Sequence, residues 1–278
     1  MLSLKFYGVR GSFPSPGSAM SYFGGNTSCV AVCNEVASQR EALLLDVGSG
    51  AVSASEELLA KGVRRFHIFL SHLHWDHVQG FPFMSLLDRK DCEVDLYGPA
   101  EYAPLEQVFS QVMSPPLFPV DLKKRGAVVR FLEISKPVHL ESLRVEVTPI
   151  AISHSDPALG YRLDSGTSSV AYLTDHQCGH DFSFISKELV SWAQGVNTLI
   201  HDAQYTKTEF SQKSDWGHST YEFAVKMAEL ANAKRLIFFH HDPKRSDEEL
   251  LLILKDWSTK ALPFELLAAR EGEEFQID

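Results

Sequence analysis

Ser71-His72-Leu73-His74-Trp75-Asp76-His77 directly follows the β-rich run Phe66 to Leu70, so its side chains emerge where a strand is expected to stop. Such ends are common mounting points for function. Three imidazoles and a carboxylate within six positions would need many polar partners if they were buried, and metal ions supply such partners. In an extended or turning loop the first two histidines can point to one side, while the aspartate and the last histidine aim at a neighbouring point. The spacing therefore predicts two adjacent metal sites, and the alternative, an exposed turn that is rich in histidine by chance, leaves it unexplained.

Strand-like and helix-like segments alternate around this motif. The strand-like ones mostly end at or just before Gly, Asp, Ser or Pro. They are Leu4 to Val9, Ser28 to Cys33, Ala42 to Asp46, Phe66 to Ser71, Val94 to Tyr97 and Leu143 to Ile150. Helical periodicity appears in Ser53 to Lys61, Phe182 to Ala193, Tyr221 to Ala231 and Asp247 to Trp257, with Ser219 and Ser246 as expected N-caps. Because no linker, charge block or repeat stands out, we expect an α/β fold with one domain over residues 1–278.

Composition narrows the class of protein. With 278 residues, of which 44% are hydrophobic, the chain can bury the core of an enzyme. A net charge of −10 argues against a broad nucleic-acid surface, because such surfaces need clustered Lys and Arg. The four cysteines form no CxxC pair, and neither a signal peptide nor an apolar segment of membrane-spanning length is expected. The sequence thus predicts a cytoplasmic protein that binds a small substrate locally and makes no membrane contact. It does not determine the oligomeric state, and a homodimer is one of the options.

The histidine-rich motif resembles the HxHxDH signature of the metallo-β-lactamase superfamily, which is followed by a distant His, an Asp and a final His. His154, Asp175 and His240 match these followers, and each comes at or near the end of an apolar, strand-like run. The resemblance implies a four-layer αββα sandwich, in which two sheets lie between helices.

The same resemblance implies a ligand set. One metal would be held by His72, His74 and His154, the other by Asp76, His77 and His240, and Asp175 would be shared between them. Nitrogen and oxygen ligands in this mixture suit Zn²⁺, with Mn²⁺ or Fe²⁺ as alternatives. His241 is the alternative to His240 as the final metal ligand. If it is not a ligand, it would support one through a hydrogen bond.

Two later segments resemble the phosphodiesterase branch of the superfamily, which includes tRNase Z. They are His201-Asp202-Ala203-Gln204 and Gly217-His218-Ser219-Thr220. The resemblance implies that Asp202 orients His218, and that His218 donates a proton to the leaving oxygen. In the alternative, His218 merely precedes a helix cap and Asp202 is an ordinary turn residue. The predicted catalytic set is His218, Asp202 and the metal ligand Asp76.

The N-terminal segments Gly8 to Ser12 and Gly24 to Ser28 resemble those of a bacterial family that includes phosphoribosyl cyclic phosphate phosphodiesterase. Their backbone amides could line an anion pocket, or they could form plain tight turns. His176, Cys178 and His180 fit no pattern, and could line the pocket or decorate a loop.

These motifs together predict a dinuclear phosphodiesterase that cleaves a small cyclic or short phosphodiester, such as a cyclic nucleotide or a ribose cyclic phosphate, by attack of a metal-bridging hydroxide. The first alternative is a tRNase Z-like endonuclease. Such enzymes carry a tRNA-gripping arm between the third His and the bridging Asp, where this chain has only the 21 positions from His154 to Asp175. The others are a hydrolase of carboxylic esters, thioesters or lactones, and a non-enzymatic, metal-loaded sensing module.

Overall fold

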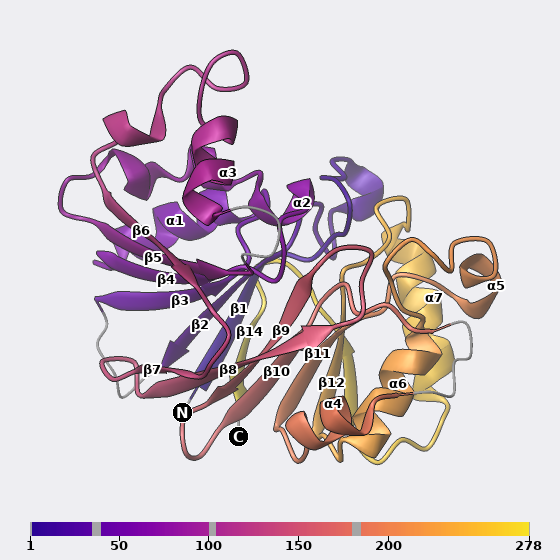
Figure 1. Cartoon of the computed structure of the whole chain (residues 1–278). Coiled ribbons are helices and arrows are strands. Elements are labelled where there is room, and N and C mark those ends of the chain that lie inside the picture. Colours follow the sequence, from indigo (N-terminus) through magenta and orange to yellow (C-terminus); the bar gives the residue numbers. More distant parts are fainter. Residues whose placement is uncertain (1, 35–39, 100–103, 180–184, 278) are drawn as a thin grey trace.

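The strands of this chain form two sheets that face each other (Figure 1). The computed structural model describes residues 2–34, 40–99, 104–179 and 185–277. Many strands are buried along their whole length, because both of their faces pack against another layer. The strands β10 (Ser169–Leu173) and β11 (Thr198–Asp202), for example, are buried at every position.

The first sheet has seven strands in the order β14-β1-β2-β3-β4-β5-β6. The strands from β3 to β6 run parallel to one another, whereas β14, β1 and β2 pair antiparallel. Their bounds are β1 (Leu2–Gly8), β2 (Cys29–Asn34), β3 (Glu41–Leu45), β4 (Arg65–Phe69), β5 (Glu93–Gly98), β6 (Val128–Glu133) and β14 (Glu274–Ile277).

The second sheet also has seven strands, in the order β13-β12-β11-β10-β9-β8-β7. Here β10 to β13 are parallel, and β7 to β10 form an antiparallel meander. The remaining bounds are β7 (Val138–Leu140), β8 (Val145–Ile152), β9 (Ala158–Asp164), β12 (Arg235–Phe239) and β13 (Glu265–Ala268).

Helices cover the outer face of each sheet. On the first sheet, α1 (Ala51–Ala60) and α3 (Leu105–Val112) share one apolar cluster with its strands. On the second, α4 (Lys187–Trp192), α6 (Tyr221–Leu230) and α7 (Asp247–Ser258) do the same. A third cluster fills the space between the sheets. The predicted four-layer αββα arrangement is therefore confirmed.

Short helices occupy the loops that connect the main elements. They are α2 (Trp75–Val78), α5 (Lys207–Phe210), η1 (Ser18–Met20), η2 (Phe81–Phe83), η3 (Ser85–Asp88) and η4 (Leu122–Lys124). Within the described ranges, none of the helices combines the length and the apolarity that a bilayer crossing requires.

Some predicted boundaries were wrong. Of the helix expected over 182–193, residues 182–184 lie outside the described part, and α4 begins only after Ser186. The cap of α6 is Thr220 rather than Ser219, because the Ser219 hydroxyl donates to the carbonyl of His176 instead. Ser246 caps α7 as predicted, in a reciprocal pair with Glu249.

Candidate metal centre

Polar residues gather at the carboxyl ends of strands from both sheets. Asp46 directly follows β3, Asp175 comes two residues after β10, and His240 directly follows β12. All three have left-handed backbones, with φ of 58°, 51° and 58°, a conformation that costs free energy in residues other than glycine. Such strain concentrates at functional sites, and here the left-handed residue turns the backbone sharply after each strand.

The first group of side chains, called here the outer group, consists of His72, His74 and His154. One nitrogen of each ring lies within 4.8 Å of the others. His74 Nδ1 and His154 Nε2 are 3.2 Å apart. His72 is buried, whereas the His74 side chain keeps 40% of its surface exposed, so this group opens to solvent.

The remaining nitrogen of each outer ring faces an acceptor. His74 Nε2 lies 2.6 Å from a carboxylate oxygen of Asp156, and His154 Nδ1 lies 2.9 Å from the carbonyl oxygen of Gly217. Both of these acceptors can only accept, so the rings donate to them and keep a lone pair on the nitrogen that faces the group. His72 Nδ1 is 3.0 Å from Ser71 Oγ, and that hydroxyl itself donates to a carboxylate.

The second group, called here the buried group, consists of Asp76, His77 and His240, all of them buried. Asp76 Oδ2 lies 3.3 Å from His77 Nε2 and 3.2 Å from His240 Nε2. Without a metal ion, burial acts to raise the pKa of the Asp76 carboxyl, but the two neighbouring rings, when protonated, hold that pKa well below its ordinary value.

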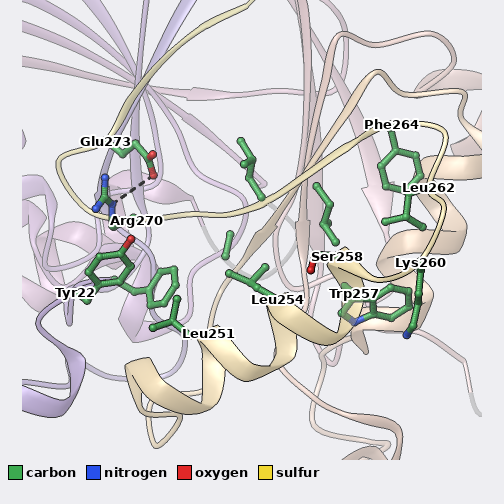
Figure 2. A pocket seen from close by; sticks show the side chains of 14 residues that line it. Tyr22, Leu251, Leu254, Trp257, Ser258, Lys260, Leu262, Phe264, Arg270 and Glu273 are labelled. Atoms are coloured by element: carbon green, nitrogen blue, oxygen red, sulfur yellow. Dashed lines mark ion pairs between the residues drawn. The ribbon is translucent and has the colours of Figure 1, made fainter.

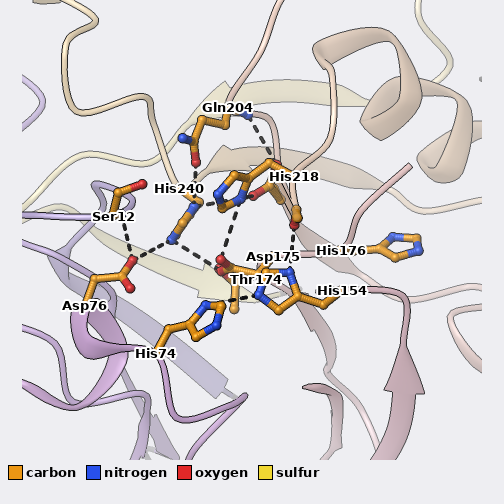
Figure 3. Close-up of polar contacts among 12 residues, drawn as sticks. Ser12, His74, Asp76, His154, Thr174, Asp175, His176, Gln204, His218 and His240 are labelled. Atoms are coloured by element: carbon orange, nitrogen blue, oxygen red, sulfur yellow. Dashed lines mark hydrogen bonds and ion pairs between the residues drawn. The ribbon is translucent and has the colours of Figure 1, made fainter. Parts of the chain in front are cut away.

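Asp175 lies between the two groups, as Figure 3 shows for the residues it labels. Its Oδ2 is 3.2 Å from His77 Nε2 and 3.3 Å from His240 Nε2. Its Oδ1 is 4.0 Å from His72 Nε2. One carboxylate therefore presents one oxygen to each group.

Polar residues also hold the buried group from behind. His77 Nδ1 lies 2.8 Å from Asp46 Oδ2, and His240 Nδ1 lies 3.0 Å from Gln204 Oε1. The backbone N–H of Ser12 donates to Asp76 Oδ2 over 2.7 Å. As in the outer group, these contacts leave the lone pair of each ring facing the centre.

The donor set fits divalent metal ions. Five imidazole nitrogens and two carboxylates converge, and the Nε2 atoms of His72 and His77 are buried without a hydrogen-bond partner among the described residues. An orphaned lone pair in a buried site is costly, and a cation removes that cost. Nitrogen and oxygen ligands of this kind suit Zn²⁺, Mn²⁺ or Fe²⁺.

A third feature adjoins the two groups. His218 Nδ1 lies 3.0 Å from Asp202 Oδ2 and 3.6 Å from Asp175 Oδ1, and the backbone N–H of Ser219 donates to Asp202 Oδ1. Burial acts to raise the pKa of the Asp202 carboxyl, but His218 and His240 keep that pKa below its ordinary value. Asp202 therefore stays ionised, accepts from His218 Nδ1, and leaves Nε2 of that ring free for another partner.

Glycines allow two loops to reach the centre. A Cβ on Gly11 would clash with the His240 ring, and one on Gly217 would clash with the His154 ring. The segment that contains Gly11 thus packs directly against the buried group. The segment beginning at Gly24 lies instead against Glu271 and Ser15.

Of the remaining candidates, those within the described part of the chain do not join the cluster. His241 Nε2 donates to the carbonyl of Ala269, and burial lowers the pKa of the His241 ring to about 3. His176 points away from the centre in Figure 3, contacts His201 at 3.0 Å, and has a pKa lowered to about 3 by burial. The buried Cys178 packs with Tyr205, Phe210 and Phe223, and His180 lies outside the described residues.

Sequence reasoning assigned no supporting role to several residues that hold the ligands, although some of them lie in the segments it singled out. They are Asp46, Ser71, Gln204, Asp156 and the backbone groups of Ser12 and Gly217. Asp46 accepts hydrogen bonds from Ser71, His77 and Tyr172. A carboxylate directly after an apolar strand-like run was a usable signal for Asp46. No comparable signal marked Asp156, and Gln204 was singled out only as part of the segment that contains Asp202.

Comparisons with known proteins agree with this fold. Residues 44–241 match the family described as Beta-lactamase superfamily domain. A ribonuclease Z from Azobacteroides pseudotrichonymphae is 26% identical in an alignment 244 positions long, which covers 76% of this chain and 82% of that protein.

Two solved structures share the fold across nearly the whole chain. A diphosphatase from the PhnP family has a TM-score of 0.70 at 21% identity and covers 100% of this chain and 98% of its own. The short form of human tRNase Z has a TM-score of 0.67 at 20% identity and covers 99% of each chain.

Proposed function

Because the chain belongs to the family of the beta-lactamase superfamily domain and is a hydrolase with that fold, we propose that it is a metal-dependent phosphodiesterase. Its substrate in this proposal is a small cyclic or short phosphodiester. The observation that carries the proposal is the hydrogen bond of His218 with Asp202 beside Asp175. Hydrolysis of a phosphodiester needs a proton donor for the leaving alkoxide, and this pair supports that role.

We assign two divalent metal ions, preferably Zn²⁺, to the centre. The outer group would hold one ion, the buried group the other, and Asp175 would contact both. Two such ions activate water at neutral pH and neutralise charge on phosphoryl oxygens. The supporting contacts of Asp46, Asp156 and Gln204 would fix the ring orientations that the ions require.

In this proposal His218 carries the proton. Its Nδ1 donates to Asp202, so a protonated ring presents its Nε2 proton to the departing oxygen. The carboxylate of Asp202 accepts from Nδ1 and thereby fixes the orientation of the ring. Asp76 would act only through its metal, held in position by the N–H of Ser12.

Processing of tRNA is the nearest competing function, because several relatives carry the name ribonuclease Z. Against it, residues between His154 and Asp175 form the hairpin of β9 and β10, so no arm is inserted there. The net charge of −10 also disfavours a long nucleic acid. We therefore favour the small substrate. The cytoplasm, the single domain over 1–278 and the homodimer stay predictions.

The test of the reaction class uses metal-loaded protein on three substrates: bis-p-nitrophenyl phosphate, a thioester and a lactone. We expect hydrolysis of the phosphodiester to dominate. Faster turnover of the thioester or the lactone would contradict the proposal.

The test of the proton donor uses His218→Ala, with the exposed His139→Ala as control. We expect unchanged metal content and turnover of a cyclic nucleotide reduced by about 100-fold to 10,000-fold. The defect should be much smaller on a nitrophenyl ester, because nitrophenolate leaves without a proton. Equal defects on both substrates would indicate a positioning role, and loss of metal would make His218 a ligand.

A further inference from the structure

Three exposed aromatic residues neighbour residues of the metal centre in the sequence. Phe13, Trp75 and Trp216 expose 50%, 56% and 59% of their surface. Single exposed hydrophobic residues are ordinary on protein surfaces. These three, however, are each adjacent in the sequence to a residue that contacts the cluster, which keeps their backbones close to it.

The connections are short on each side. Trp75 lies between the ligands His74 and Asp76 in the sequence. Trp216 precedes Gly217, whose carbonyl oxygen accepts from His154. Phe13 follows Ser12, whose N–H donates to Asp76. The backbone of Trp75 therefore lies next to the metal ligands, and that of Trp216 lies next to the segment that carries His218.

The His218 side also carries a cation. Lys213 Nζ lies 5.6 Å from the Trp216 ring centroid and 4.4 Å from that of Tyr205. The Tyr205 ring in turn is 5.7 Å from the His218 ring. Lys213 pairs with Asp242 at 3.3 Å but remains part-exposed, so it can also meet an anion. An indole beside an ammonium suits a nucleotide, whose base stacks on the ring while its phosphate attracts the cation.

We propose that Trp75 and Trp216 stack on nucleobases of the substrate, so that the phosphodiester hydrolysed here carries at least one nucleoside. This inference rests on the proposed function and deepens it. It favours nucleotides over ribose phosphates that lack a base. Stacking on an exposed aromatic ring tolerates any base, so we expect little sequence preference.

The direct test is binding, which needs no turnover. Calorimetry on metal-loaded protein would compare adenosine 5′-monophosphate with ribose 5-phosphate, which differ by the base. We expect the nucleotide to bind about 5-fold to 150-fold more tightly, as stacking of one base on an aromatic ring implies. Trp75→Ala with Trp216→Ala should abolish the preference, and Trp75→Phe with Trp216→Phe should keep most of it. Leu252→Ala, an exposed change on α7 (59% exposed), is the control.

A kinetic arm separates this inference from the proposed function. Thymidine 5′-p-nitrophenyl phosphate and methyl p-nitrophenyl phosphate share a leaving group but differ in the nucleoside. We expect the alanine variants to raise KM only for the thymidine ester. Equal binding of adenosine 5′-monophosphate and ribose 5-phosphate to the wild type would overturn the stacking proposal and leave the proposed phosphodiesterase activity intact. The same holds if the variants affect both esters alike. If neither ester is hydrolysed but the nucleotide preference persists, the reaction class fails and the stacking stands.

Discussion

The outer and buried groups of the metal centre are built from similar residues at different depths. His74 exposes 40% of its side chain, and its partner Asp156 exposes 41%. In the buried group, the side chains of His77 and its partner Asp46 are both fully buried. Water can replace a lost partner of His74, but it cannot replace one of His77. The two groups should therefore hold ions with different affinity and respond differently to the loss of a supporting carboxylate.

The largest effect is expected from Asp175→Ala, because this carboxylate faces both groups. We predict loss of both ions and a fall in phosphodiesterase turnover of at least about 1,000-fold, as both ions contribute to the chemistry. Metal analysis and turnover on the same sample would check this. Asp256→Ala, at an exposed site on α7, is the matched control. A variant that keeps both ions would show that Asp175 does not bridge.

Neighbouring histidines give the second comparison. His240→Asn should remove the ion of the buried group, because His240 Nε2 faces Asp76 and Asp175. His241→Asn should leave the metal content unchanged, because His241 faces the carbonyl of Ala269. Metal content per chain distinguishes the two variants. Loss of metal in His241→Asn but not in His240→Asn would make His241 the ligand.

The supporting carboxylates give the third comparison. Asp46→Ala leaves Ser71, His77 and Tyr172 without their buried partner, so it should lower stability by about 3 to 5 kcal/mol. It should also weaken metal binding by about 10-fold to 100-fold. Urea unfolding of metal-free and metal-loaded protein separates the two losses.

Asp156→Asn should have the smallest effect. Because both Asp156 and His74 are part-exposed, water can satisfy the His74 ring, and we expect metal affinity to fall by less than about 10-fold with stability unchanged. The same unfolding and metal-binding measurements check this. A loss as large as that of Asp46→Ala would remove the distinction between the groups.

The local part of the centre could be predicted from the sequence. The residues from His72 to His77 stand so close together that their spacing alone indicated metal binding, and the layered fold followed from the resemblance that this motif carries. His154, Asp175 and His240 were reached through that resemblance and not from spacing.

The supporting residues could not be predicted, because their roles arise from contacts across the fold. Asp156 meets His74 over 82 positions and Gln204 meets His240 over 36 positions. Short apolar runs such as β11 and β13 also carry too little periodicity to separate strand from helix. The Thr220 cap was missed because two adjacent hydroxyls were equally able to cap, and tertiary contacts chose between them.

The most direct test of the central claim is a count of metal ions per chain during stepwise chelation, with turnover of bis-p-nitrophenyl phosphate followed in parallel. Two ions held at different depths should leave in two steps, the outer before the buried, and turnover should vanish with them. We predict a metal content close to two ions per chain before chelation begins. A single ion per chain, or a metal-free protein with undiminished turnover, would contradict the account.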